Sequence, residues 1–255
     1  MTDCKFWVVI PARYASSRLR GKPLCDIAGY PMFWHVYQNA VASGASQVIV
    51  ATDDERIYHV AQQMSAEVCM TASTHRSGTD RVAEAVQHYN IPSDAIVVNV
   101  QGDEPLLPPV LIRQVAQALQ HQTTAQVATL CEPITTREEV FNPHIVKVVL
   151  DKQGFALYFS RAPIPWQREA FAETTLQSGF HFRHVGIYAY RVKDLLHNTQ
   201  LPPCPLEQIE ALEQLRVLFN GGRIYVEQAV LKAGIGVDTP EDLATVQQLM
   251  TAIPT

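Results

Sequence analysis

The sequence predicts an α/β protein in which helices cover both faces of a mostly parallel β-sheet. Three short apolar segments, residues 6–10, 48–51 and 96–100, have the length and composition of buried strands. Segments of helical periodicity separate them, and this alternation is typical of parallel strands joined by crossover helices. The length of 255 residues allows a substantial core, and we expect one domain, 1–255.

Helical periodicity follows each of the first strands. The expected helices lie near residues 31–43, 54–65 and 79–89, and a fourth follows Pro108 and Pro109. The first would begin at Pro31 and place Trp34, Tyr37 and Val41 on one face, which we expect to belong to the core. These helices supply the layers that cover the sheet.

The pattern changes after about residue 125. Closely spaced strands are expected at residues 127–130, 146–150, 156–159 and 185–190. Helical periodicity then returns near 206–219 and 240–251. We therefore interpret 125–200 as a mixed-sheet extension of the single domain.

Composition restricts the class of protein. Hydrophobic residues make up 47% and charged residues 18%, which is ordinary for a globular protein. No apolar stretch approaches the roughly 18–20 residues that cross a bilayer, so we expect a cytoplasmic protein with no membrane partner. The net charge of -5 disfavours nonspecific nucleic-acid binding. Five cysteines without CxxC spacing indicate neither a disulfide framework nor a zinc site.

The loop after the first strand, residues 11–24, has the chemistry of a phosphate site. It contains the small residues Ala12, Ala15, Ser16 and Ser17 and the cations Arg13, Arg18 and Lys22. Small residues let backbone N–H groups approach phosphates, and ligands of parallel sheets bind at the carboxyl ends of strands. The GxGxxG motif is absent, and a Walker A loop would need glycine at Ser16 and Ser or Thr at Pro23. The loop therefore favours a triphosphate over a solvated surface.

Two acidic segments are candidates for a metal site. Asp103 and Glu104 follow a buried strand, and a carboxylate there suits Mg²⁺, with Asp103 the better ligand and Glu104 a solvent-facing neighbour. The same residues also make a good turn. Asp238 is the second candidate ligand. A helix is expected to begin at Pro240, so Asp238 or Thr239 could instead simply cap that helix. The residues alone leave both alternatives open.

Residues 13–22 resemble the signature loop of the sugar-activating nucleotidyltransferases, which have a glycosyltransferase-A-like, Rossmann-like fold. More narrowly, the chain resembles the cytidylyltransferases that act on 3-deoxy-manno-octulosonate (Kdo). Further matching segments are TD (52–53), HRSGTDR (75–81), NVQGDEP (99–105), FSRAPIPW (159–166), RHVGIY (183–188), LEQLR (212–216) and GVDTPED (236–242). Arg20 departs from the family pattern, which usually has proline there, and leaves loop stiffness and charge in doubt.

The resemblance implies attack by the anomeric 2-hydroxyl of Kdo on the α-phosphorus of CTP, which yields CMP-Kdo and pyrophosphate for lipopolysaccharide biosynthesis. It implies Mg²⁺ bound by Asp103 and Asp238, catalytic roles for Arg13 and Lys22, and a homodimer formed through 125–200. Amino-Kdo or sialic acid remains an alternative substrate, and a noncatalytic nucleotide-binding protein is the other functional class.

The resemblance also assigns residues to each substrate. The nucleotide would contact Ala12, Arg13, Arg18, Lys22, Thr71, Ser77 and Gly78, and the sugar would contact Gln101, Arg161, His184, Tyr188, Glu213 and Gln214. A planar guanidinium such as that of Arg161 suits the Kdo carboxylate.

Structural alternatives exist for several of these residues. Ser77 and Gly78 are consistent with a helix start, and Glu213 with a solvated helix face. Since His184 and Tyr188 share a strand face by period two, they are also consistent with interior residues.

A neighbouring charged pair, Asp80 and Arg81, is expected at a helix's first turn as a surface or intrachain pair.

Overall fold

A nine-stranded mixed β-sheet forms the centre of the described part of the chain. The structure, a computed structural model, describes residues 4–15, 19–168 and 179–251. Along the sheet the strands are β11 (Ile224–Gln228), β7 (Val127–Pro133), β10 (Phe182–Arg191), β6 (Ile96–Asn99), β1 (Phe6–Ala12), β4 (Gln47–Thr52) and β5 (Glu67–Met70). Two more strands, β8 (Lys147–Leu150) and β9 (Ala156–Ser160), extend the sheet from β10. A separate hairpin pairs β2 (Asp26–Ile27) with β3 (Tyr30–Pro31).

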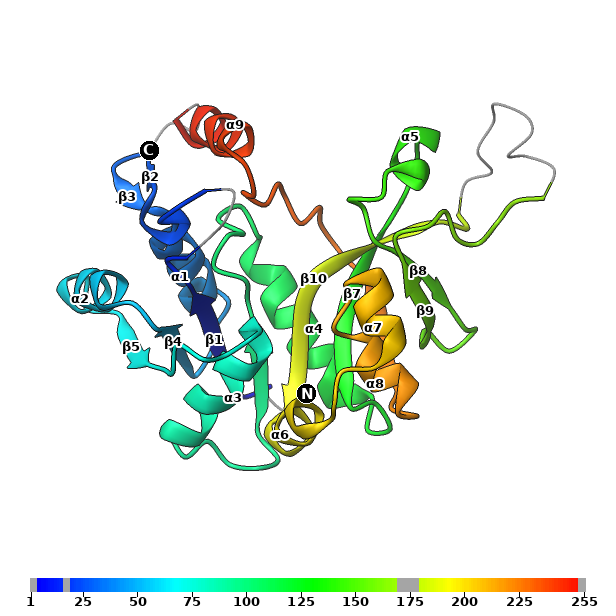
Figure 1. Cartoon of the computed structure of the whole chain (residues 1–255), viewed down its shortest axis with the longest axis horizontal. Helices are drawn as coiled ribbons and strands as arrows, with labels where there is room; N and C mark the ends of the chain where they lie inside the picture. Colours follow the sequence, from blue (N-terminus) through cyan, green and yellow to red (C-terminus); the bar gives the residue numbers. More distant parts are fainter. Residues whose placement is uncertain (1–3, 16–18, 169–178, 252–255) are drawn as a thin grey trace.

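Strand direction divides this sheet into two parts. Strands β6, β1, β4 and β5 are parallel neighbours, as expected for the first half of the chain. Strand β10 runs antiparallel to both β6 and β7, while β7 and β11 are parallel. The long β10 therefore joins the parallel part to the predicted mixed-sheet part, as Figure 1 shows. The prediction of an α/β fold with a mostly parallel sheet is confirmed.

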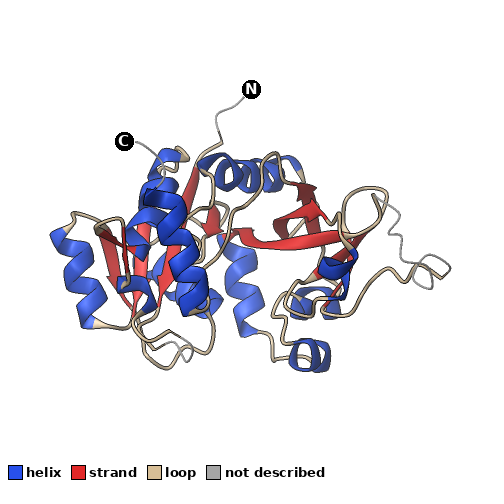
Figure 2. Ribbon diagram, turned by 90° about the horizontal axis from the view of Figure 1, so that it is seen from above, coloured by secondary structure: helices blue, strands red, loops and turns tan. Residues whose placement is uncertain are grey.

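Helices cover both faces of the sheet (Figure 2). Their bounds are η1 (Lys22–Leu24), α1 (Met32–Ala42), α2 (Glu55–Gln63), α3 (Gly78–His88), α4 (Pro109–His121), α5 (Arg137–Phe141), α6 (Val192–Gln200), α7 (Pro205–Glu210), α8 (Leu215–Phe219) and α9 (Pro240–Thr251). Alternate residues of β1 explain the two layers: Val8 packs with Leu111 of α4, and Val9 packs with Val82 of α3 on the other face. In the described residues, every helix is too short or too polar to cross a bilayer.

Two sequence-based expectations about the helices were wrong in detail. The buried face of α1 carries Phe33, Val36 and Ala40, whereas Val41 is 48% exposed. Trp34 and Tyr37 are partly buried and pack against the core as expected, so of the three predicted residues only Val41 departs from the prediction. The helical stretch near 206–219 is also interrupted: Ala211 ends α7 in a left-handed conformation (φ 52°), and α8 begins at Leu215.

Candidate active site

The ammonium group of Lys22 lies between two carboxylates that are distant in sequence. Its Nζ donates to Asp103 Oδ2 at 2.6 Å and to Asp238 Oδ1 at 3.1 Å. It also donates to the backbone carbonyl of Val237 at 2.9 Å. Lys22 belongs to η1, Asp103 follows β6, and Asp238 precedes α9. The structure thus brings together three of the four predicted catalytic residues.

The backbone holds these segments close together. A Cβ atom on Gly102 would lie 2.8 Å from the carbonyl oxygen of Pro11, so the ends of β1 and β6 approach as only glycine allows. The amide of Val237 donates to the carbonyl of Asp103 at 2.8 Å. This bond fixes the backbone that carries Asp238 against the segment that follows β6.

The cap of α9 is Thr239 rather than Asp238. Thr239 Oγ1 accepts a hydrogen bond from the amide of Asp242 at 3.2 Å, and Asp242 Oδ2 accepts from the amide of Thr239 at 2.9 Å. This reciprocal arrangement is a capping box. The carboxylate of Asp238 is directed to Lys22, so of the two alternatives the cap belongs to Thr239.

Charge and burial shift the pKa values of two groups beside these carboxylates. Partial burial works against the charged form of Lys22, but Asp103 and Asp238 outweigh it and raise the pKa of the ammonium group. Burial and the nearby Asp103 carboxylate raise the pKa of Glu104 to about 8. The expectation of a solvent-facing Glu104 was wrong, because its carboxylate lies against Gly236. A Cβ atom added to Gly236 would lie only 2.8 Å from Glu104 Oε1.

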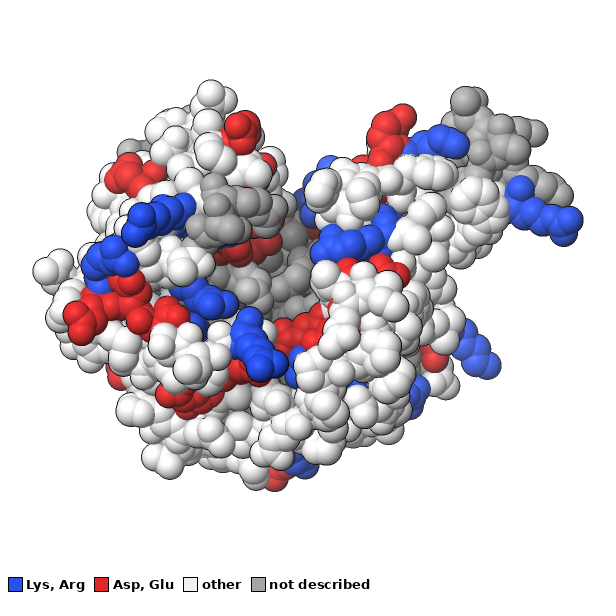
Figure 3. Space-filling model, viewed as in Figure 1, with Lys and Arg blue, Asp and Glu red and all other residues white. Residues whose placement is uncertain are grey.

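A cavity of about 300 Å³ opens over this cluster. Its walls include Arg13, Lys22, Gly78, Gln101, Asp103 and Asp238. Figure 3 shows a hollow between the two halves of the molecule with acidic and basic side chains along its walls. Ala12 is buried at the end of β1 beside the cavity, and Arg18 lies outside the described residues. The arrangement can accept a polyphosphate through Arg13 and Lys22 and a cation through the two aspartates.

A second cavity, of about 160 Å³, adjoins the first and shares Gly78 and Gln101 with it. Four of the six predicted sugar residues line this second cavity: Gln101, Tyr188, Glu213 and Gln214. Burial raises the pKa of the Tyr188 phenol far above its usual value, so the phenol is a neutral donor. The two cavities provide adjoining spaces for two substrates.

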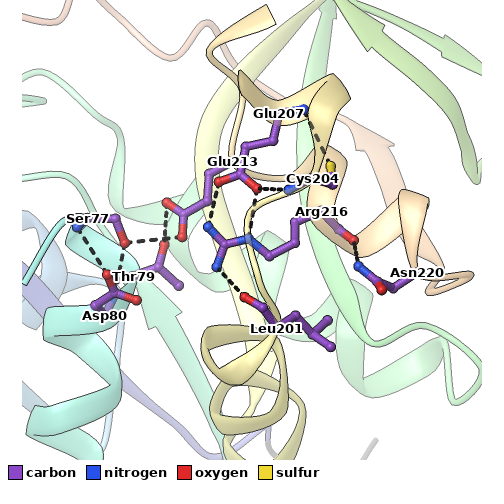
Figure 4. Close-up of polar contacts among 9 residues, drawn as sticks. All are labelled: Ser77, Thr79, Asp80, Leu201, Cys204, Glu207, Glu213, Arg216 and Asn220. Carbon is purple, nitrogen blue, oxygen red and sulfur yellow. Dashed lines mark hydrogen bonds and ion pairs between the residues drawn. The ribbon is translucent and has the colours of Figure 1, made fainter. Parts of the chain in front are cut away.

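The carboxylate of Glu213 connects the segment between α7 and α8 to the start of α3 (Figure 4). Ser77 Oγ donates to Glu213 Oε1 and Thr79 Oγ1 donates to Oε2, both at 3.2 Å. Ser77 also caps α3 through a capping box with Asp80, which confirms the helix-start interpretation, while its contact with the nucleotide stays a prediction. Burial raises the pKa of Glu213, although the nearby Arg216 opposes this shift. Glu213 is part-buried in the site and does not lie on a solvated helix face.

An ion pair behind Glu213 holds its loop in place (Figure 4). Arg216 Nε donates to Glu207 Oε2 at 2.8 Å, and the side chains of the pair are only 12% and 13% exposed. Glu207 belongs to α7 and Arg216 to α8, so the pair joins the two helices that flank residues 211–214.

The other two predicted sugar residues, His184 and Arg161, have well-defined protein partners. The His184 ring lies 5.0 Å from Phe159 and 5.3 Å from Tyr188, and Nε2 lies 2.9 Å from Thr129 Oγ1. Burial lowers the pKa of His184 to about 3, so the ring is neutral at physiological pH. The contact with Tyr188 agrees with their predicted common strand face.

Arg161 lies at the end of β9, outside the residues that line either cavity. Its Nε donates to the backbone carbonyl of Glu210 at 2.9 Å, and Nη1 donates to that of Pro143 at 3.0 Å. These contacts join the extension to the end of α7, so Arg161 has a structural role whatever it contacts in a complex.

Thr71 belongs to a buried network beside the predicted nucleotide site. Its hydroxyl accepts a hydrogen bond from Arg81 Nη1, and Arg81 Nη2 donates to Asp53 Oδ2 at 2.8 Å. Arg81 is fully buried, so the expectation of a surface pair was wrong for it, and it forms an intrachain ion pair with Asp53. The guanidinium is buried because Asp53 and Thr71 supply the partners that a buried charge requires.

Five further residues line the second cavity without having been assigned to the site from the sequence: Thr79, Tyr190, Asn198, Arg216 and Val217. Tyr190 follows Tyr188 by two positions on β10, so strand periodicity was an available signal for it. Asn198 lies on α6, and nothing in the local sequence distinguishes it from a surface amide.

Comparison with known proteins shows the family of the chain. The family model described as cytidylyltransferase matches residues 7–226. A protein of Nitrosococcus oceani named 3-deoxy-manno-octulosonate cytidylyltransferase is 57% identical over 247 residues, which cover 95% of each chain. A protein of the same name from Aeromonas hydrophila is 57% identical over 250 residues, or 96% of this chain and 98% of the other.

The chain belongs to the 3-deoxy-manno-octulosonate cytidylyltransferase family. A solved structure of CMP:2-keto-3-deoxy-manno-octonic acid synthetase complexed with CTP has a TM-score of 0.88 and 44% identity, covering 97% of this chain and 98% of its own. A cytidylyltransferase from Leptospira borgpetersenii has a TM-score of 0.64 at 16% identity, a likeness of fold alone, covering 99% of this chain and 89% of its own.

Proposed function

We propose that this enzyme transfers CMP from CTP to the anomeric 2-hydroxyl of Kdo and releases pyrophosphate. The observation that carries the proposal is the cluster of Lys22, Asp103 and Asp238 on the wall of the first cavity, which adjoins the second cavity at Gly78 and Gln101. Membership of the Kdo cytidylyltransferase family supports the choice of both substrates. The product, CMP-Kdo, would serve lipopolysaccharide biosynthesis.

Lys22 and Arg13 would act on the triphosphate. Arg13 is exposed on the wall of the first cavity, and Lys22 reaches the same space from η1. Cations fixed at these positions would neutralise the polyphosphate and stabilise the charge that develops on the departing pyrophosphate. Arg18, the backbone near Ala12, and Thr71, Ser77 and Gly78 complete the proposed nucleotide site, with Ser77 and Gly78 at the amino-terminal end of α3.

The proposal includes Mg²⁺ held by Asp103 and Asp238. Both carboxylates bond to one ammonium group, so they lie close enough together to share a small cation. Two carboxylate ligands suit Mg²⁺, which takes its remaining ligands from phosphate and water. When bound, the ion would supply electrostatic activation of the sugar hydroxyl and of the α-phosphate.

The second cavity would hold the sugar. Gln101 lies at the junction with the first cavity, while Tyr188, Glu213 and Gln214 offer hydrogen-bonding groups around the remaining space. Arg161 and the neutral His184 would act from the extension, and Arg161 would exchange its bonds to the carbonyls of Glu210 and Pro143 for the carboxylate of the sugar. In-line positioning of the two substrates requires no covalent nucleophile.

A cytoplasmic homodimer formed through 125–200 is part of the proposal, with no membrane or nucleic-acid partner. Large apolar side chains on this extension support the interface, since Leu157, Trp166 and Phe180 are 60%, 62% and 58% exposed. Light scattering coupled to size-exclusion chromatography measures the oligomeric state. Leu157→Glu should favour the monomer. The control Leu249→Glu changes an exposed leucine of α9, outside 125–200, and should leave the dimer intact.

Pyrophosphate release tests the proposed function. The purified protein should release pyrophosphate with CTP, Kdo and Mg²⁺ together, and much less when ATP replaces CTP or sialic acid replaces Kdo. Equal kcat/KM for sialic acid and Kdo, or reaction with amino-Kdo alone, would reject the substrate assignment. No release with any acid sugar would favour a noncatalytic nucleotide-binding protein.

A further inference from the structure

Two buried side-chain amide nitrogens at the second cavity have no hydrogen-bond partner in the described part of the chain. Asn198 is 6% exposed and Gln214 is 8% exposed. Within residues 4–15, 19–168 and 179–251, neither Asn198 Nδ2 nor Gln214 Nε2 has an acceptor, and both residues line the cavity. A buried donor without an acceptor is costly and uncommon in native proteins. The pair therefore points to a ligand with hydroxyl or carbonyl oxygens.

The position of Asn198 shows which end of a ligand it would meet. The two cavities join at Gly78 and Gln101, so a reacting hydroxyl must lie at that end to face the aspartates. Asn198 comes from α6, and neither α6 nor α8 contributes to the walls of the first cavity. Asn198 therefore lines the second cavity alone and is not among the residues at which the two cavities join.

We infer that Asn198 is a further sugar-binding residue, whose amide donates to the hydroxyls of the exocyclic tail of Kdo. This inference rests on the proposed function. Kdo has its anomeric carbon and carboxylate at one end and a two-carbon tail with two hydroxyls at the other. With the anomeric end beside Gln101, the tail extends toward Asn198 and Gln214, and Tyr190 and Val217 supply wall around it.

The same arrangement explains how the enzyme would select its sugar. An acid sugar that lacks the tail hydroxyls would leave the buried amides unpaired. Sites built around buried donors reject ligands that lack the matching oxygen more strongly than apolar pockets reject extra or missing methylenes. Asn198 is therefore expected to determine specificity for the tail rather than to affect the reacting atoms.

The test compares Kdo with its 7,8-dideoxy analogue in Asn198→Leu. Leucine has a similar volume and no donor, so this change should not lower Tm, because it removes an unpartnered polar group. The kcat/KM for Kdo should fall about tenfold, as expected for one buried hydrogen bond, while kcat/KM for the analogue and KM for CTP change less than about twofold. Gln200→Leu, on the exposed end of the same helix, is the matched control and should match the wild type.

Each other outcome counts against the inference. An equal loss for both sugars, or a loss below about twofold for Kdo, would show that the amide binds only water or has a structural role. If Asn198→Leu does not fold, Asn198→Ala must show the same selective loss. Absence of Kdo-dependent turnover in the wild type would overturn the proposed function and this inference together, whereas normal turnover with unchanged tail preference would overturn this inference alone.

Discussion

Asp238 and Thr239 are adjacent in sequence but have separate contacts, which allows catalysis and stability to be separated by two substitutions. Asp238 Oδ1 accepts from Lys22 at 3.1 Å, and its side chain is 53% exposed. Thr239 instead caps α9 through its bond with the Asp242 amide. Asp238→Asn should therefore reduce turnover with little effect on folding, and Thr239→Ala should do the opposite.

The expected losses of stability overlap, and the expected loss of activity is what separates the two substitutions. An exposed ion pair contributes about 0–1 kcal/mol, so Asp238→Asn should lower Tm by no more than about 2–4 °C. Loss of the Thr239 hydroxyl removes a cap worth about 0.5–2 kcal/mol. Removal of one of the two anionic ligands proposed for Mg²⁺ should cost about 3 kcal/mol of transition-state stabilisation, or about 100-fold in kcat.

The assay measures kcat from pyrophosphate release at saturating CTP, Kdo and Mg²⁺, with Tm determined by calorimetry on the same samples. Asp103→Asn should match Asp238→Asn, and the double variant should be scarcely worse than either, because both ligands serve one ion. Near-normal kcat in Asp238→Asn would refute the shared-cation reasoning. Equal loss of kcat in Thr239→Ala would show that the cap, and not the ligand, controls activity.

Three further predictions concern the sugar side of the site. Burial lowers the pKa of His184 from 6.5 to about 3. Between pH 3 and pH 6.5, the unfolded chain therefore binds a proton at His184 that the folded protein does not bind. Stability should fall as pH drops below about 6.5, and Tm measured from pH 7.5 to 5 should vary less in His184→Asn. Arg216→Met should lower the free energy of unfolding, measured by denaturant titration, by about 2–3 kcal/mol, because it leaves the largely buried carboxylate of Glu207 unpaired. It should also raise KM for Kdo. The control Lys193→Met removes a pair whose side chains are 55% and 79% exposed, so it should change the free energy of unfolding by less than about 1 kcal/mol. Arg161→Lys keeps the charge but loses the planar fork, so steady-state kinetics should show a higher KM for Kdo with KM for CTP unchanged.

The position of the segments proposed to bind the nucleotide was largely predictable from sequence because its determinants are local. A strand that ends in a loop of small and basic residues predicts a phosphate site, and the loop with Arg13 and Lys22 does lie at the first cavity. Asp103 was predictable for the same reason, since it follows the neighbouring parallel strand. The partnership of Asp103 with Asp238 required the family resemblance, because no local pattern connects residues 135 positions apart.

The sugar side was less predictable because it depends on how helices and strands pack. Nothing in the helical pattern near 206–219 indicated that Ala211 would take a left-handed conformation and free the segment that carries Glu213. The same limitation applies to Arg81, whose burial is possible only because Asp53 and Thr71 arrive from neighbouring strands. Sequence periodicity indicates which face of an element is apolar. It does not indicate which distant side chain will supply the hydrogen-bond partner of a buried polar group.

The contacts of Glu213 give a physical reason for placing both substrates in one continuous site. Its carboxylate accepts from Ser77 and Thr79 at the start of α3, which also borders the first cavity, proposed to hold the nucleotide, at Gly78. The capping box fixes the first turn of α3, and the Arg216 pair fixes the segment that carries Glu213. Two rigid elements therefore meet at one carboxylate. Their mutual position determines the distance between the sugar cavity and the Lys22 cluster, as in-line attack requires.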